Sequence, residues 1–314
     1  MSDQLALLKE GFRRAWHYQR VLWFIFGISL VLGHFSTAPV THKLDWSIDH
    51  SLHAQRLTKM FDYGSFSALS SNPEIKLFEV AGVSMTYSMV FFVIMLFLTG
   101  GILEAYRSGR KLTTREFFEA CGSYFWRWVR LFLLMAIVLV PPISLAYVVS
   151  DQTGEMMLSA AQEKTAFWMV VAAFGLAGLL MMCIRLWFDM AQVRAVVDEE
   201  NGMWRNAGRA FKITFSNFGT LFGIYFSISL LGWLVFAIGL YIWTRMPPAD
   251  YRWTFLILEI AILWGFWIRL WQRACEMSWY QRRVLASIVA PAPVPVTPPP
   301  NPLLTIAPPP ATPL

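Results

Sequence analysis

The sequence predicts an all-α polytopic membrane bundle of six transmembrane helices, and its hydropathy and charge pattern carry this prediction. Four long stretches contain no Asp, Glu, Lys or Arg, namely residues 80–103, 131–150, 165–184 and 213–244. A charge-free helix of about 20 residues matches the hydrocarbon core of a bilayer, which is about 30 Å thick. Hydrophobic residues make up 56% of the chain and charged residues 15%. Soluble domains carry about 25% charged residues, so a soluble fold is excluded.

Two further stretches bring the number of spans to six. Residues 21–41 lack all four charged residue types, and residues 253–268 contain only Glu259. In chain order, the expected spans are about 21–41, 80–103, 131–150, 165–186, 216–244 and 253–271. Together they form an integral membrane domain over residues 1–290. The first outer loop, residues 42–79, is long and carries an irregular apolar stripe, which predicts an amphipathic helix resting on the membrane surface.

Lys and Arg residues lie mainly on one side of the predicted spans. Of the 26 in the chain, 19 fall in the N-terminal segment, the second and fourth connections and the C-terminal segment. Excess positive charge marks cytoplasmic loops. We therefore expect both termini to be cytoplasmic and the protein to lie in a bacterial inner membrane. A cleaved signal peptide ending near Ala38 is the alternative for the first span, but its basic leader would be unusually long.

The six spans are expected to form three hairpin repeats, each led by a cytoplasmic interfacial helix. Basic, aromatic-rich stretches precede the odd-numbered spans, with aromatic pairs seven residues apart on one helical face. These pairs are Trp16 and Trp23, Phe118 and Phe125, and Phe211 and Phe218. The even-numbered spans end alike, since residues 184–187 and 268–271 both read Ile-Arg-Leu-Trp. The predicted units are residues 4–110, 113–200 and 203–283.

Three local motifs refine this picture. Thr113 and Glu116 form a capping box that predicts the start of a helix. Gly219 and Gly223 form a GxxxG pattern and are expected to face another helix closely, as are residues 100–101 and 175–178. The pair at residues 141–142, both Pro, predicts a kink in the third span. Such a kink can gate a pore, although most serve packing alone.

No cofactor or metal site is expected. The three cysteines fall near the predicted cytoplasmic side, where disulfides are rare, and their spacing does not match a metal motif. Loop residues His42, Asp45, Asp49, His50 and His53 offer metal-ligand types. The apolar residues interleaved with them favour a surface helix instead. Nucleic acid binding is not expected either, because the net charge of +6 is confined to membrane flanks.

The last 24 residues, 291–314, contain 11 prolines and no charged side chain. Such a segment favours polyproline II and cannot bury a core, so we expect a disordered cytoplasmic tail. The expected partners are the lipid bilayer, together with another membrane protein or a binder of the Pro-rich tail.

Charged residues within membrane spans are candidates for function. Glu259 is the one acidic residue well inside a predicted span, where it could bind a cation, relay a proton or serve only as a satisfied structural group. A second candidate set lies at the inner ends of the spans and is expected to form a cytoplasmic ion-pair belt that fixes the register of the hairpins. Its members are Glu104, Arg107, Arg185, Asp189, Arg194 and Arg269.

A resemblance supports the predicted architecture. Residues 185–197 read RLWFDMAQVRAVV, and the aromatic stretches 117–128 and 204–218 flank them. Together they resemble a group of uncharacterised six-span bacterial membrane proteins, which is similar to the membrane domain of some glycerophosphodiester phosphodiesterases. The likeness covers most of residues 10–280 and implies a membrane setting. The catalytic barrel, with its His and Glu metal-site residues, is absent from these 314 residues, so the resemblance implies no enzymatic activity.

Three classes of function fit the sequence. The lack of a catalytic constellation favours a non-enzymatic protein, a scaffold or accessory component of a membrane complex. The alternative is a transporter or channel for a small solute or lipid, which Glu259 and the paired prolines would suit. A membrane enzyme acting on lipids is the third class, and it would need a nucleophile or metal cluster near the interface. A polar cavity lined by Glu259 and several spans would favour transport.

Overall fold

The computed structural model describes residues 2–49, 77–157, 163–200, 202–245 and 251–285. These residues form long α-helices and, in the described ranges, no β-strand. The helices are α1 (Ser2–His17), α2 (Gln19–Asp49), α5 (Leu77–Ser108), α6 (Thr114–Met157), α7 (Glu163–Val197), α8 (Met203–Ser216), α9 (Phe218–Arg245) and α10 (Tyr251–Tyr280), followed by a π-helical turn at Gln281–Leu285. Most of the loop 42–79 and the tail 291–314 lie outside the described residues.

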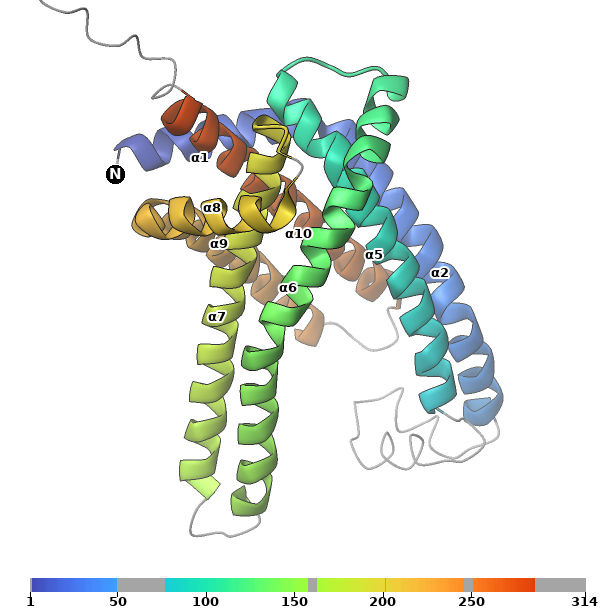
Figure 1. The fold of residues 1–314 in the computed structure, drawn as a ribbon. Coiled ribbons are helices and arrows are strands. Elements are labelled where there is room, and N and C mark those ends of the chain that lie inside the picture. Colours follow the sequence, from blue (N-terminus) through green and yellow to red (C-terminus); the bar gives the residue numbers. More distant parts are fainter. Residues whose placement is uncertain (1, 50–76, 158–162, 201, 246–250, 286–314) are drawn as a thin grey trace, which may run out of the picture.

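Six of these helices are long and apolar enough to cross a membrane, which confirms the predicted all-α multi-pass bundle. The crossing segments are Gln19–Ala38, Gly82–Ser108, Thr114–Thr153, Phe167–Val197, Phe218–Arg245 and Arg252–Arg283. Several run past the expected boundaries at the end where α1 and α8 lie (Figure 1). We call this end the basic end, because the connections that lead into it carry most of the Lys and Arg residues. The other is the distal end.

The leading segments of the first and third hairpins are separate helices, whereas that of the second is not. A break at Tyr18 separates α1 from α2, and a break at Asn217 separates α8 from α9. The Asn217 amide side chain donates to the Ile213 carbonyl at 3.1 Å, which competes with the backbone pattern and ends α8. In the second unit the leading segment and the span form the single helix α6, so the expected separate interfacial helix is not present there. This helix continues through Pro141 and Pro142.

The hairpins close into a ring at the basic end. The return helix of each unit packs against the leading segment of the next, α5 on α6, α7 on α8 and α10 on α1. The repeated tryptophans make matching contacts there. Trp187 donates from its indole nitrogen to the Ala207 carbonyl at 2.8 Å, and Trp271 donates to the Leu8 carbonyl at 3.0 Å. The third hairpin therefore packs against the first in the same way as the second packs against the third, so the three hairpins form a closed ring.

These contacts correct the register of the aromatic repeat. Trp187 lies edge-on to Phe211 at 5.1 Å, and Trp271 lies edge-on to Phe12 at 5.3 Å between ring centroids. Phe211 therefore corresponds to Phe12. The seven-residue pattern had instead made Trp16, one helical turn later, the equivalent of Phe211. The pattern missed this because a shift of four residues leaves an aromatic on nearly the same helical face.

Close helix packing also lies at the basic end, where it confirms the contact expected at residues 100–101 but not those expected at the other glycines. A Cβ on Gly101 would lie 2.7 Å from the Cys121 sulfur, and one on Gly100 would lie 3.0 Å from the Ala120 carbonyl oxygen. The expected GxxxG contact is wrong. Gly219 has nothing within 4 Å of a Cβ, and Gly223 meets only the end of the Gln4 side chain. Residues 175 and 178 also face open space.

Candidate functional site: a cavity with a charged end

Four membrane helices enclose a cavity in the bundle, and each contributes one face. The lining positions recur at intervals of three, four and seven residues, so they lie along a single side of each helix. They are Phe92, Met95, Leu96 and Thr99 from α5; Leu131, Phe132, Met135 and Leu139 from α6; Met181, Ile184, Arg185, Phe188, Asp189 and Gln192 from α7; and Ile262, Gly265, Phe266, Arg269 and Arg273 from α10.

The cavity has a volume of about 690 Å³. Small-molecule sites usually fall between about 300 and 1,000 Å³, so this space suits a ligand rather than a few waters. Its lining is divided by position along the helices. Aliphatic and aromatic side chains line the part toward the distal end, whereas the polar and charged side chains gather toward the basic end. The cavity is thus amphipathic along the bundle axis.

Asp189 and Arg269 form the central ion pair of the charged end. Arg269 donates from both terminal nitrogens to the two carboxylate oxygens of Asp189, each at 2.5 Å. Only 4% of the Asp189 side chain and 17% of the Arg269 side chain are exposed. A two-pronged arginine–carboxylate pair is among the strongest hydrogen-bonded contacts. Removing one partner of such a buried pair leaves an uncompensated charge, which costs about 3–5 kcal/mol.

Arg273 and Gln192 carry hydrogen-bonding capacity that the protein itself does not use. Arg273 is buried, and its Nη1 donates to the Thr99 hydroxyl at 3.0 Å. Its Nε and the side-chain amide oxygen Oε1 of Gln192 are buried with no hydrogen-bond partner among the described residues. Arg185 also lines the cavity, is exposed, and has no assigned ion pair or hydrogen bond among the described residues. A buried polar atom without a partner is costly, so these groups suit a bound polar ligand.

The charges that line the cavity do not balance. Arg185, Arg269 and Arg273 bring three positive charges, and Asp189 brings the one negative charge among the lining residues. Because Asp189 is already paired with Arg269, the remaining positive charge belongs to Arg185 and Arg273. In a low-dielectric setting an uncompensated guanidinium attracts an anion strongly. The charged end is therefore complementary to an anionic group.

A second cavity of about 330 Å³ lies on the other side of α10, toward α9. It shares Arg185, Gly265 and Arg269 with the first cavity. On this side Gln272 donates to the Ser229 hydroxyl at 2.8 Å, which ties α10 to α9. Gly265 lies between the two cavities and places no side chain there, and a Cβ added to it would meet nothing within 4 Å.

Glu276 lies one turn beyond Arg273, and its carboxyl group is buried without a hydrogen-bond partner on either oxygen. It borders a small space of about 10 Å³ together with Tyr225 and Gln272. A space of this size holds about one water molecule.

The predicted ion-pair residues separate into two groups. Arg107 pairs with Glu104 at 2.9 Å and with Glu199 at 2.9 Å, while Arg194 pairs with Asp198 at 3.0 Å and with Glu200 at 2.9 Å. These pairs lie near helix ends and do not line the cavity. Arg185, Asp189 and Arg269 line it. The partner of Asp189 is Arg269 of the next hairpin rather than its own-helix neighbour Arg185.

Glu259 lies away from the cavity. Its side chain is half-buried on α10, with no hydrogen-bond or ion-pair partner among the described residues, and it lines none of the described cavities. The sequence linked transport to a polar cavity lined by Glu259 and several spans, and the cavity between α5, α6, α7 and α10 is not lined by Glu259.

Several site residues were missed by sequence reasoning, namely Thr99, Gln192, Arg273 and Glu276. Arg273 belongs to the C-terminal segment whose Lys and Arg residues indicate the membrane orientation, and its spacing from Arg269 and Glu276 puts all three on one face of α10. That spacing was the available signal. Thr99 and Gln192 carried no signal of their own.

Across the described helices, no group of three or more His, Cys, Asp or Glu side chains is arranged to hold a metal ion. The structure does not describe the side chains of the loop residues His42, Asp45, Asp49, His50 and His53. Cys121, Cys183 and Cys275 are free thiols.

Comparison with known proteins returns no match to a protein-family model, to a curated protein or to a solved structure.

Proposed function

We propose that this chain is a non-enzymatic membrane protein that holds an anionic amphiphile, a membrane lipid, in the cavity between α5, α6, α7 and α10. The observation that carries the proposal is the division of the cavity into an apolar part and a cationic end. A lipid has the same division, with acyl chains on one side and a negatively charged headgroup on the other. Arg185 and Arg273 would hold the headgroup.

The lining chemistry supports binding over catalysis. Its polar side chains are arginines, one aspartate, one glutamine and one threonine. Asp189 is fully engaged by Arg269, and Thr99 already accepts from Arg273. No activated nucleophile with an adjacent base lies among the described lining residues. A bound lipid would suit an accessory component of a membrane complex, in a bacterial inner membrane with both termini in the cytoplasm, as the charge distribution favours.

Lipid transport is the second candidate, and the paired cavities favour it. The spaces on the two sides of α10 share Arg185 and Arg269 and are separated at Gly265. A headgroup held by one could move to the other past a residue with no side chain. Vesicle assays that measure lipid exchange between leaflets would separate holding from transport.

Photo-crosslinking from two positions on α6 tests the binding proposal. Met135 lines the cavity, whereas Ile137 is 64% exposed on the outside of the same helix. A photoreactive amino acid at each position is irradiated in vesicles of equal phosphatidylglycerol and phosphatidylcholine. At Ile137 the adducts should follow the bulk lipid composition. At Met135 they should be enriched in the anionic lipid, by about threefold or more if the selectivity exceeds about 0.7 kcal/mol. Equal ratios at both positions would contradict the proposal.

A further inference from the structure

Another pocket lies at the basic end, apart from the cavities around α10, where the break between α1 and α2 meets the loop before α6. It has a volume of about 260 Å³. Its lining comes from residues 17–24, from Ala105 of α5, and from residues 111–118. The pocket lies at the first residues of two membrane spans, which begin at Gln19 and Thr114. In a bilayer this level is that of the lipid headgroups.

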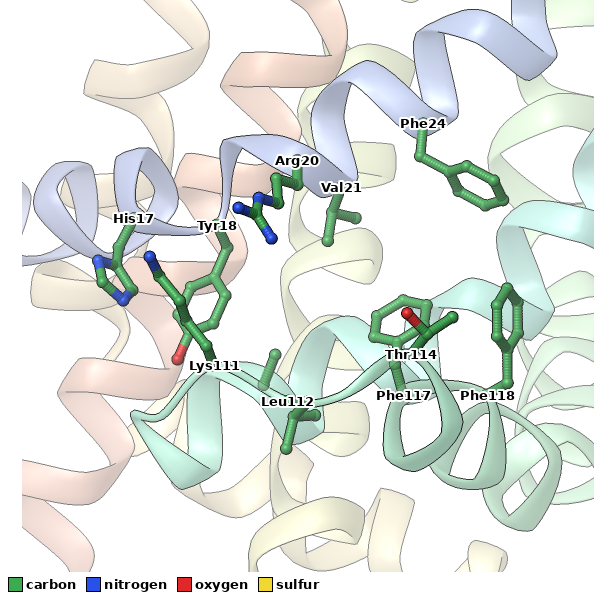
Figure 2. Close-up of a pocket in the computed structure, with 11 residues that line it drawn as sticks. His17, Tyr18, Arg20, Val21, Phe24, Lys111, Leu112, Thr114, Phe117 and Phe118 are labelled. Atoms are coloured by element: carbon green, nitrogen blue, oxygen red, sulfur yellow. The ribbon is translucent and has the colours of Figure 1, made fainter.

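The lining is divided between cationic and aromatic sides (Figure 2). His17, Tyr18, Arg20 and Lys111 gather on one side, and the phenyl rings of residues 24, 117 and 118 lie on the other. Tyr18 fixes the polar side, because its hydroxyl donates to the Arg110 carbonyl at 2.9 Å. Burial raises the pKa of Tyr18, so this hydroxyl stays a neutral donor.

Among the described residues, Arg20 and Lys111 of this pocket have no counter-ion, whereas the neighbouring cations do. Arg14 pairs with Glu10 at 3.0 Å, and Arg110 pairs with Glu116 at 2.8 Å. Arg20 and Lys111 have no hydrogen bond or ion pair with any described residue. The carboxylate of Glu116, at the start of α6, is already engaged by Arg110 and Thr113. Two uncompensated positive charges therefore face one small, partly apolar space.

We infer that this pocket binds the phosphate of an anionic phospholipid from the leaflet at the basic end. Arg20 and Lys111 would contact the phosphate, since both donate hydrogen bonds and carry full positive charge. The three phenylalanine side chains would contact the glycerol and the first carbons of the acyl chains. A free phosphate ester offers the same anion without the apolar part, so it would contact the cationic side of the pocket and leave the three phenylalanine side chains without a ligand contact.

Lipid binding to resin-bound full-length protein in detergent tests this inference. Radiolabelled phosphatidylglycerol and phosphatidylcholine are titrated separately, and the bound lipid is counted. The test variant is Arg20→Gln with Lys111→Gln. The control is Arg205→Gln with Lys212→Gln, which removes the same charge from exposed positions of α8 outside the pocket. The central cavity is unchanged in both, so their difference reports on this pocket alone.

The test variant should bind phosphatidylglycerol about tenfold more weakly at one site, because two charge-assisted hydrogen bonds are lost. The control should bind like the wild type, and phosphatidylcholine should show no such site. Because the four substituted side chains are exposed, both variants should keep the wild-type melting temperature. Equal loss in test and control would mean a diffuse charge effect and would overturn the inference. So would displacement of the lipid by millimolar glycerol phosphate, which would assign the pocket to a soluble phosphate ester.

Discussion

The basic half and the distal half of the bundle are held together in different ways. At the basic end, large side chains such as Trp128, Tyr106 and Trp279 are almost fully buried, and polar side chains link successive hairpins. Toward the distal end, Tyr147 and Trp233 are about 70% exposed, at 72% and 69%. Figure 1 shows the α2–α5 and α6–α7 hairpins diverging in that direction. The specific contacts thus lie at one end, and the central cavity extends from them toward the distal end.

This difference indicates what each half contributes. Between two apolar helices in a bilayer there is little hydrophobic drive to associate, because lipid is as apolar as the side chains. The polar contacts and close glycines of the basic half supply the specificity instead. In the distal half, surrounding lipid can fill the space between helices, which suits a protein that accommodates a lipid.

The largest effect is expected from breaking the ion pair of the basic half. Asp189→Leu leaves Arg269 buried without its partner and should lower the free energy of unfolding by about 3–5 kcal/mol. Arg269→Met should act similarly. The double variant should recover most of the loss, since no uncompensated charge remains. Unfolding by denaturing detergent gives the values, and a double variant as unstable as the singles would contradict the assignment.

Adding side chains at glycines should separate the two halves next. Gly101→Leu forces a side chain against Cys121 and Phe117 and should cost about 1–3 kcal/mol. Gly33→Leu lies on α2 toward the distal end with nothing within 4 Å, and it should change stability by less than about 0.5 kcal/mol. Gly219→Leu should be equally mild. Thermal unfolding in detergent measures all three, and a large loss at Gly33 would argue for tight distal packing.

The ring closure predicts matched losses at the repeated tryptophans. Trp187→Phe and Trp271→Phe each remove one indole hydrogen bond to a short leading helix, so each should cost about 1 kcal/mol. Tyr147→Phe serves as a distal aromatic control and should be neutral. If Trp187→Phe lowered the stability and Trp271→Phe did not, the contact between α10 and α1 would not be equivalent to that between α7 and α8, which would contradict the closed ring.

The smallest effect is expected at Glu259. It lies on the half-exposed surface of α10 without a described partner, so Glu259→Leu should be neutral within about 0.5 kcal/mol or slightly stabilising, because an ion is costly in hydrocarbon. Glu259→Gln should also be tolerated. Loss of an ion flux in proteoliposomes on Glu259→Gln, with folding intact, would instead favour a cation transporter.

The comparison of halves also explains what the sequence could predict. Hydropathy indicated all six spans, because each depends only on local composition. The Ile-Arg-Leu-Trp repeat indicated equivalent helix ends, and its two tryptophans make equivalent contacts. Local sequence places Arg273 only among the basic residues of the C-terminal segment and cannot predict its burial, because the neighbours that bury it come from elsewhere in the chain, as Thr99 of α5 does. The cavity could not be predicted, since it depends on which faces of four helices meet.

A lipid held in the central cavity is the claim most directly open to test, and Gly265 offers the means. Gly265 lines the central cavity as well as the cavity toward α9, and a Cβ there would meet no atom within 4 Å, so a tryptophan has room for its large side chain at this wall. Gly178→Trp is the matched control, since Gly178 is exposed on α7, equally free of contacts, and outside the described cavities. Native mass spectrometry of each protein released from anionic membranes counts the retained lipids. We expect wild type and Gly178→Trp to retain one more anionic lipid than Gly265→Trp. Equal retention in all three, with Gly265→Trp folded, would contradict the proposed function.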